Sequence, residues 1–295
     1  MTSTTTPDGL PTNWGRWGLN DQLGTLNHIS AEAQARGART VTAGRAVSLA
    51  MPIIPVLLAG GGPVSGGMAM MPTPVLQMMN YNPTPPAYVD VLVINTHHVA
   101  LTHIDAPVHV PVDDMVYPGV PREEAVSGGT AHHGTTSAFA AGISTRGVLL
   151  DLAPGDRLAP GHSVTGADFD RAEQRAGLSV ELGDALVVRG GWTIHQDMAQ
   201  PLPGMTLDAI HWMAEREISL YVGDIGDRPP GLPGDTIPLH YVALARLGLP
   251  LVDGARVTEL AATCAELGRS EFLLTIGAIP VLGTTGMPVN PLAIF

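Results

Sequence analysis

The sequence has no lysine and only one cysteine. All 15 basic residues are arginine, so Schiff-base chemistry and a P-loop lysine are excluded. Cys264 alone can form neither an intramolecular disulfide nor a cysteine zinc cluster. The single cysteine fits a reducing, cytoplasmic location, which we take as an expectation.

Positive charge and long apolar runs are also scarce. The formal net charge is −12 at pH 7, so the chain lacks the basic footprint of proteins that bind nucleic acid or anionic membranes. The first residues lack the basic-then-apolar pattern of a signal peptide, and no apolar run reaches the ~18 residues of a spanning helix. We therefore expect neither nucleic acid nor a membrane as a partner.

Helical and strand patterns alternate along the 295 residues, which favours one α/β domain over residues 1–295 with an N-terminal arm over about 1–30. The predicted helices cover 31–37, 165–177, 206–217, 239–247 and 255–268. The predicted strands cover 46–56, 90–105, 146–151, 185–189, 219–223 and 271–280. Loops are predicted at 58–67, which is rich in glycine, at 68–88, which is rich in Met and Pro, and at 227–237.

Six of the 11 histidines lie between positions 97 and 133, and they direct the search for a site. Strand alternation places His103 and Asp105 on one face, and Pro107 then allows the chain to turn and return His109 to the same pocket. Imidazole and carboxylate groups suit Zn and Mn, and such a metal lowers the pKa of bound water toward ~7. On spacing alone, a hydrogen-bonded core pair of His103 and Asp105 stays an open alternative.

The segment Thr102-His-Ile-Asp-Ala-Pro-Val-His109 resembles the signature of the cyclase family, H-x-G-T-H-x-D-x-P-x-H. That family is similar to bacterial kynurenine formamidase and isatin hydrolase. Further landmarks are spread over nearly the whole chain: Asn13–Gly18, Asp21–Asn27, Arg146–Asp151, Gly183-Asp184, Arg189–Trp192 and Gly286–Ala293. The resemblance implies a swivelling β/β/α fold, a mixed sheet with flanking helices, and a homo-oligomer, either dimer or tetramer. It also implies one or two Zn or Mn ions and hydrolysis of an amide, lactam or lactone of a small molecule.

The resemblance also implies roles for individual residues. His103 and Asp105 would be metal ligands, and His109 would bind a second metal or act as the acid/base. His240 matches a helix-borne catalytic histidine of the family. Asp253 stands where a ligating Glu is expected, so its carboxylate is one methylene shorter.

The motif departs from the family pattern at its start. Val99 occupies the position of the first histidine and cannot coordinate a metal, and Leu101 replaces a glycine. A bulge in the strand could let His97 or His98 substitute as the ligand. Otherwise the site has lost a ligand, and it binds metal weakly or works without metal.

Four residues are candidates for contact with the substrate. Trp14 and Trp17 could form part of an apolar lid, Arg189 could bind a carboxylate, and His133 could line the pocket. Each has a plain structural alternative: core packing for the tryptophans, an ion pair for Arg189, and a solvated loop for His133. A turn role is favoured for Asp224 and Asp227, which flank Gly226.

Three functions are compatible with these features. The leading hypothesis is a metal-dependent hydrolase that activates water, with His109 or His240 moving protons. The altered ligand set also motivates a polyketide-type cyclase or dehydratase of secondary metabolism, with or without metal. A non-catalytic protein that binds a small molecule is the third.

Overall fold

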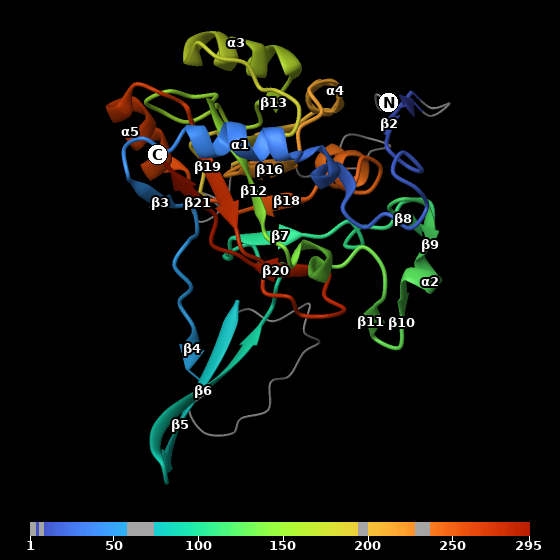
Figure 1. Ribbon diagram of the computed structural model, residues 1–295, viewed down its shortest axis with the longest axis vertical. Coiled ribbons are helices and arrows are strands. Elements are labelled where there is room, and N and C mark those ends of the chain that lie inside the picture. Colours follow the sequence, from blue (N-terminus) through green and yellow to red (C-terminus); the bar gives the residue numbers. More distant parts are fainter. Residues whose placement is uncertain (1–3, 6–8, 58–73, 194–199, 228–236) are drawn as a thin grey trace.

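The body of the protein is built on a nine-stranded mixed sheet (Figure 1). The computed structural model describes residues 4–5, 9–57, 74–193, 200–227 and 237–295. Across the sheet the strands are β20 (Gly286–Pro288), β7 (His103–Asp105), β18 (Leu251–Asp253), β16 (Leu220–Gly223), β14 (Ala185–Arg189), β12 (Ile143–Asp151), β19 (Glu271–Ile276), β21 (Leu292–Ile294) and β3 (Ala46–Ser48). The four strands from β18 to β12 are parallel, and the strands outside them pair antiparallel.

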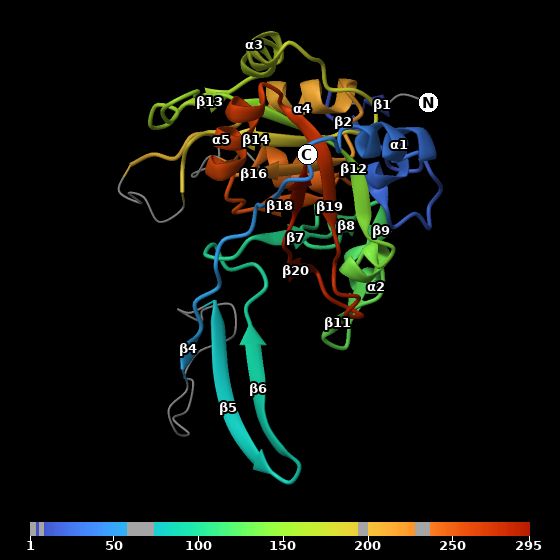
Figure 2. The ribbon, with the colours of Figure 1, turned by 60° about the vertical axis from the view of Figure 1, so that its left-hand side comes forward.

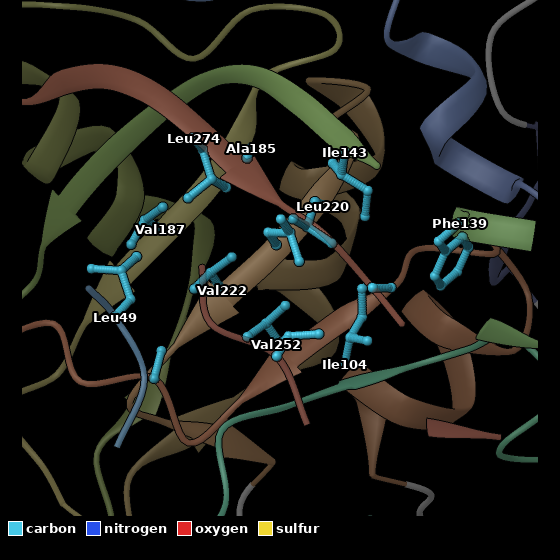
Figure 3. Packing of buried hydrophobic residues seen from close by; sticks show 14 of the residues in the cluster. Leu49, Ile104, Phe139, Ile143, Ala185, Val187, Leu220, Val222, Val252 and Leu274 are labelled. Carbon is cyan, nitrogen blue, oxygen red and sulfur yellow. The ribbon is translucent and has the colours of Figure 1, made fainter. Parts of the chain in front are cut away.

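Apolar packing covers both faces of the parallel strands, which explains their continuous apolar runs. On one face, Val187, Val222 and Val252 pack with Ile104 of β7 and with Leu274 (Figure 3). The other face carries a second cluster, formed by residues such as Leu186, Val188, Tyr221, Phe169 and Trp212. β7 is therefore anchored in the main core although it has only three residues.

The helices begin and end close to their predicted positions, and their caps show why. They are α1 (Ala31–Arg39), α3 (Gly166–Ala176), α4 (Leu207–Glu215), the π-helix η4 (Leu239–Leu244) and α5 (Thr258–Leu267). The Ser30 side chain accepts the N–H of Ala33, and Thr165 forms a reciprocal capping box with Asp168. Gly177 ends α3 in the left-handed conformation, at φ +66°. The five predicted helices are thus confirmed, although η4 and α5 are shorter than expected.

The remaining elements are short, apart from one hairpin. They are β1 (Thr4–Thr5), β2 (Pro11–Thr12), η1 (Gly24–His28), β4 (Val56–Leu57), β5 (Val75–Pro83), β6 (Pro86–Ile94), β8 (Met115–Val116), β9 (Val120–Pro121), α2 (Arg122–Ala125), β10 (Val126–Ser127), β11 (Thr130–Ala131), η3 (Thr136–Phe139), β13 (Ser163–Val164), β15 (Gly204–Met205) and β17 (Gly226–Asp227). The strands predicted at 146–151, 185–189, 219–223 and 271–280 correspond to β12, β14, β16 and β19. No helix within the described residues has the length and apolarity needed to cross a membrane.

The predicted continuous strand over 90–105 is wrong. β6 ends at Ile94, and the chain makes turns before β7 begins at His103. The N–H of His98 bonds to the carbonyl of Asn95, and the N–H of Leu101 bonds to the carbonyl of His98, so these groups close turns instead of joining a ladder. Strand alternation therefore says nothing about which way His97 points.

Two further segments differ from their predictions. Of the strand predicted over 46–56, only β3 and the first residue of β4 have strand geometry. The loop predicted at 68–88 contains β5 and the start of β6, which form an antiparallel hairpin that projects from the body (Figures 1 and 2). The glycine-rich loop at 58–67 lies outside the described residues, as do residues 68–73 and 228–236.

The N-terminal arm lies against the segment that follows η4. Asn13 Nδ2 donates to the carbonyl of Leu247 at 3.0 Å, and Trp14 Nε1 donates to the carbonyl of Ala245 at 2.9 Å. Thr25 Oγ1 donates to the carbonyl of Ser219 at 2.8 Å, just before β16. The arm therefore supports the region that carries η4.

Candidate metal centre

The three-residue strand β7 positions the centre of the site. It lies between β18 and β20, so that His103 is opposite Asp253 on one side and Pro288 on the other. Asp105 is opposite Leu251 and Gly286. Because side chains alternate along a strand, His103 and Asp105 project from the same face.

The Asp105 carboxylate is the centre of the cluster, and the residue is only 1% exposed. His97 Nδ1 donates to its Oδ1 at 2.8 Å, and His103 Nε2 lies 3.5 Å from the same oxygen. His240 Nε2 lies 3.4 Å from Oδ2, which has no hydrogen-bond partner among the described residues. A buried carboxylate oxygen without a hydrogen bond is costly unless another group binds it.

His97, and not His98, lies in this cluster. The Nε2 atom of His97 is 2.8 Å from Thr285 Oγ1, and its ring stacks on that of His109 with centroids 3.7 Å apart. The His98 ring instead accepts the N–H of Ala100 at 3.1 Å, inside the turn. The turns after β6 thus bring His97 beside the carboxylate. The sequence alone did not decide between His97 and His98 for this position.

His240 reaches the cluster from η4 and is held on its far side by Asp227. Its Nδ1 donates to Asp227 Oδ2 at 2.6 Å. Asp227 also accepts the backbone N–H groups of Leu239 and His240, at 2.7 and 3.0 Å. The Nε2 atom of His240 therefore faces Asp105, and it also lies 3.5 Å from Asp253 Oδ2.

Two sets of side chains could hold a metal ion, and Asp105 belongs to both. One is His97, His103 and Asp105, and the other is Asp105, His109 and His240; within each set the ligand atoms lie within 4.8 Å of one another. Imidazole nitrogens with a carboxylate suit Zn or Mn. His103 Nδ1 donates to the carbonyl of Leu101 at 2.9 Å, which leaves Nε2 as the ligand atom. The unpaired Oδ2 of Asp105 and this donor chemistry both fit a bound cation.

The surroundings shift the pKa values of the cluster in opposite directions. Burial alone would raise the pKa of Asp105, but its contacts with His240 and His97, and the charges of His103 and His109, hold it well below its usual range. Burial lowers the pKa of His109 to about 4, and the neighbouring histidines add to this effect against Asp105. For His240, burial is outweighed by Asp105, Asp227 and Asp253, which raise its pKa to about 11. Such opposed shifts within one cluster are typical of functional sites.

Asp253 differs from Asp105 although the two carboxylates are close. Burial raises the pKa of Asp253, and the negative charge of Asp105 adds to this effect against the charge of His240. Asp253 belongs to neither of the two metal-holding sets among the described residues, but its 3.5 Å contact with His240 places it at their edge.

The predicted substrate-binding residues have other partners in the structure. Arg189 pairs with Asp151 at 2.9 Å and donates to the carbonyls of Ala153 and Asp156. Trp14 donates to a backbone carbonyl, and Trp17 packs edge-on against His28 with ring centroids 5.0 Å apart. These contacts match the structural alternatives for the three residues.

His133 lies outside the cluster, on a loop whose next residue, Gly134, bonds through its carbonyl to the N–H of Val108. Burial lowers the pKa of His133 against the opposing effects of Asp21 and Tyr117. The ring is therefore packed beside the arm, and its contact with substrate stays a prediction.

Sequence reasoning missed three contributors to the cluster. Thr285 bonds to His97, and Asp227, for which a turn role was favoured, holds His240. Gly286 leaves room for His97, because a Cβ there would lie 2.3 Å from Cε1 of that ring. The only signal in the sequence was the family landmark Gly286–Ala293. It does not indicate that Gly286 lies beside His97.

The fold and the cluster together define a mixed α/β protein with a buried His/Asp centre suited to a metal. The model of the Cyclase family matches residues 25–227. The chain belongs to the cyclase family. This match confirms the resemblance, and the mixed sheet with its helices confirms the predicted cyclase-like fold.

Solved structures show the same fold. The crystal structure of a novel cyclase is 26% identical, and the match covers 99% of this chain and 100% of that chain with a TM-score of 0.82. Isatin hydrolase A from Ralstonia solanacearum is 16% identical, with coverage of 84% and 91% and a TM-score of 0.57. An isatin hydrolase bound to the product analogue thioisatinate is 15% identical, with coverage of 90% and 99% and a TM-score of 0.59. A comparison with curated proteins gave no match.

Proposed function

We propose that this protein is a metal-dependent hydrolase that opens an amide, lactam or lactone of a small molecule. The observation that carries the proposal is the buried Asp105 carboxylate: its Oδ2 has no hydrogen-bond partner in the described part of the chain, and four imidazoles lie around the carboxylate. The two structural neighbours named isatin hydrolases share the fold, and their names agree with this class of reaction.

His97, His103 and Asp105 would hold the ion, with Zn or Mn as the expected metal. When bound, such an ion makes water acidic enough to ionise near neutral pH and polarises a carbonyl. The set of Asp105, His109 and His240 would hold a second ion if there are two. In this assignment His97 takes over the role of the first histidine of the family signature, whose position is occupied by Val99 in this chain.

The chain's own groups orient the site and move protons. The carbonyl of Leu101 fixes the ring of His103 through Nδ1, and Asp227 fixes the ring of His240 in the same way. The Nε2 atom of His240 then faces the reaction space beside Asp105 and can exchange a proton there. His109, whose ring lies 6.2 Å from that of His240, is the second proton-transfer candidate, and either residue could protonate the leaving group.

The substitution Asp105→Asn tests the proposal because it keeps the side-chain shape and removes the charge. Purified wild-type protein should carry about one Zn or Mn per chain and should hydrolyse members of a panel of amides, lactams and lactones. The variant should lose both the metal and the activity. The matched control is Asp114→Asn, at an exposed turn residue with φ +59°, a conformation that asparagine tolerates. Full hydrolysis after thorough chelation, with no metal detected, would overturn the proposal.

A cyclase or dehydratase of the polyketide type is the second candidate. Val99 and Leu101 favour it, because they replace a ligand and a glycine of the hydrolase-like signature. Reactions in ¹⁸O-labelled water separate the two: hydrolysis incorporates solvent oxygen into the product, and cyclisation need not. A non-catalytic binding protein is the third candidate, and it predicts small-molecule binding without turnover even after metal is added.

A further inference from the structure

Thr285 directly precedes β20, and its backbone is fixed by two neighbouring segments. Its carbonyl accepts the N–H of Ala106, the residue after β7, at 2.9 Å. The carbonyl of Thr284 accepts the N–H of Thr136 at 3.1 Å, and the hydroxyl groups of these two threonines bond to each other. β20 and β7 lie side by side in the sheet (Figure 1). The Thr285 side chain is therefore held at a set position beside the cluster.

The ring of His97 lies between two partners of different chemistry. Nδ1 is 2.8 Å from Asp105 Oδ1, and Nε2 is 2.8 Å from Thr285 Oγ1. The His109 ring stacks on one side of it, and a Cβ at Gly286 would lie 2.3 Å from its Cε1 atom. A flip of the ring would replace both bonded nitrogens with carbon, so these contacts specify one orientation.

The Asp105 carboxylate decides where the proton of a neutral His97 ring lies when no metal is bound. Although burial alone would raise the pKa of Asp105, its contacts with His240 and His97 hold it well below its usual range. An ionised carboxylate can only accept hydrogen bonds, so Nδ1 of His97 carries the proton. Nε2 then has a free lone pair, and the Thr285 hydroxyl must donate to it.

A cation shared by Asp105 and His97 requires the opposite arrangement. A neutral imidazole binds a metal through the nitrogen that carries no proton, and Nδ1 is the nitrogen that faces Asp105. The ring proton is then on Nε2, which donates to Thr285 Oγ1. The His97 side chain is 23% exposed, so water can take the proton from Nδ1 and return one to Nε2. The ring stays neutral and releases no net proton.

A hydroxyl group suits both arrangements, because it has one rotatable O–H donor and two acceptor lone pairs. The partners of the other histidines are different. His103 Nδ1 donates to a backbone carbonyl at 2.9 Å, and His240 Nδ1 donates to the Asp227 carboxylate at 2.6 Å. Those acceptors hold His103 and His240 in one tautomer each, whereas Thr285 can hold His97 in either.

We propose that Thr285 is a positioning residue that keeps His97 oriented in both of its tautomers. Its hydroxyl donates to Nε2 when no metal is bound and accepts from Nε2–H when a metal is bound at Nδ1. The ring thus changes tautomer without losing the hydrogen bond on its second nitrogen. This role rests on the proposed function for its metal, but it requires no substrate.

The first test follows both ring nitrogens of His97 by ¹⁵N NMR, with zinc alone as the probe. The protein is labelled at histidine and held at about pH 8, where an ordinary imidazole is neutral. The proton should be on Nδ1 before zinc is added and on Nε2 afterwards, with the Nε2–H protected from exchange with water. The spectrum of His97→Ala assigns the signals. A proton that stays on the same nitrogen in both states would overturn the proposal.

The second test compares three substitutions by competition for zinc against a chromogenic chelator. Thr285→Val keeps the shape and removes the hydroxyl, so zinc affinity should fall roughly tenfold and the Nε2–H should exchange freely. Thr285→Ser restores the hydroxyl, and its affinity should lie within about threefold of the wild type. Thr284→Val is the matched control, because it disturbs the same segment through Thr136 and leaves the partner of His97 in place. Its His97 spectrum should match that of the wild type.

Equal losses of affinity in Thr285→Val and Thr284→Val, or no rescue by Thr285→Ser, would show that Thr285 only packs the segment and would overturn the proposal. The outcome is separable from that of the proposed function. Zinc binding with the expected change of tautomer but no hydrolysis of any substrate would count against the hydrolase and leave the role of Thr285 intact. Hydrolysis by the wild type with unchanged zinc affinity in Thr285→Val would do the reverse.

Discussion

Replacing His97 with alanine tests whether this chain has moved a metal ligand by two positions along its sequence. His97 Nδ1 lies 2.8 Å from Asp105, Nε2 lies 2.8 Å from Thr285, and the ring stacks on His109. Loss of a group that merely supports a ligand costs 10- to 100-fold in metal affinity. Loss of a ligand itself should cost on the order of 100-fold or more, which corresponds to about 2.7 kcal/mol at 25 °C.

The control is His98→Ala, at the adjacent histidine. That ring accepts one backbone N–H in the turn and belongs to neither metal-holding set, so affinity should change by less than about threefold. Competition against a chromogenic chelator measures affinity, and elemental analysis measures the metal retained. Val99→His should not tighten binding, because position 99 is 53% exposed in the turn. Equal losses for the two alanine variants, or wild-type affinity in His97→Ala, would refute the assignment.

Three further predictions concern groups that support the site or the arm. Gly286→Ala should weaken metal binding roughly tenfold or more, because its Cβ would fall 2.3 Å from the His97 ring; chelator competition measures this, and unchanged affinity would contradict it. Asp227→Asn should lower kcat roughly 10- to 100-fold with little change in KM, because the Nδ1–H of His240 loses its carboxylate; steady-state kinetics on an active substrate decide, and an effect confined to KM would count against a positioning role. Burial lowers the pKa of His28 to about 4, and the charge of Arg16 adds to this effect. Below pH 6.5 the unfolded chain therefore takes up a proton on His28 while the native residue stays neutral. As a result, about 3 kcal/mol of the free energy of unfolding is lost as the pH falls from 6.5 to 4. Urea unfolding of His28→Phe should show a correspondingly weaker decline over that window, and an identical pH dependence in both proteins would show that His28 is not responsible.

Elements with strong local signals could be predicted from the sequence. Ser30, Thr165 and Gly177 mark helix ends because caps act within a few residues of the chain. The buried strands β12 and β14 could be recognised because parallel strands covered on both faces need continuous apolar runs. These predictions depend only on near neighbours, which explains their success.

The break between β6 and β7 could not be predicted from the same signals. The polar residues Asn95–His98 interrupt the apolar run that ends at Ile94, but Val99 and Leu101 then resume a strand-like alternation, which led to the prediction of one continuous strand. The hairpin was missed for a related reason: Met and Pro residues near 68–88 favoured a loop, while β5 is stabilised by pairing with β6 over its whole length. Strand formation there depends on a partner and not on propensity.

The site was predicted only in part: residues that are close in the sequence were recognised, and contacts between distant residues were not. His103, Asp105 and His109 lie within one short motif, so their spacing was enough to predict that they share a site. The structure adds Thr285, 188 residues from His97 along the chain, and a pairing of His240 with Asp227 across a loop. Long-range contacts of this kind depend on sheet order, which spacing within a motif does not contain.

The position of β7 has a consequence for how the molecule assembles during synthesis. This strand is paired on one side by β18 and on the other by β20, which begins at Gly286, far beyond His103 along the chain. A nascent chain that has already exposed His103 and Asp105 still lacks both flanking strands, and it can complete the cluster only after Gly286–Pro288 have left the ribosome. His103 and Asp105 are therefore synthesised well before the strands that position them, and a chain truncated just before Gly286 would keep β18 but leave β7 without its second flanking strand.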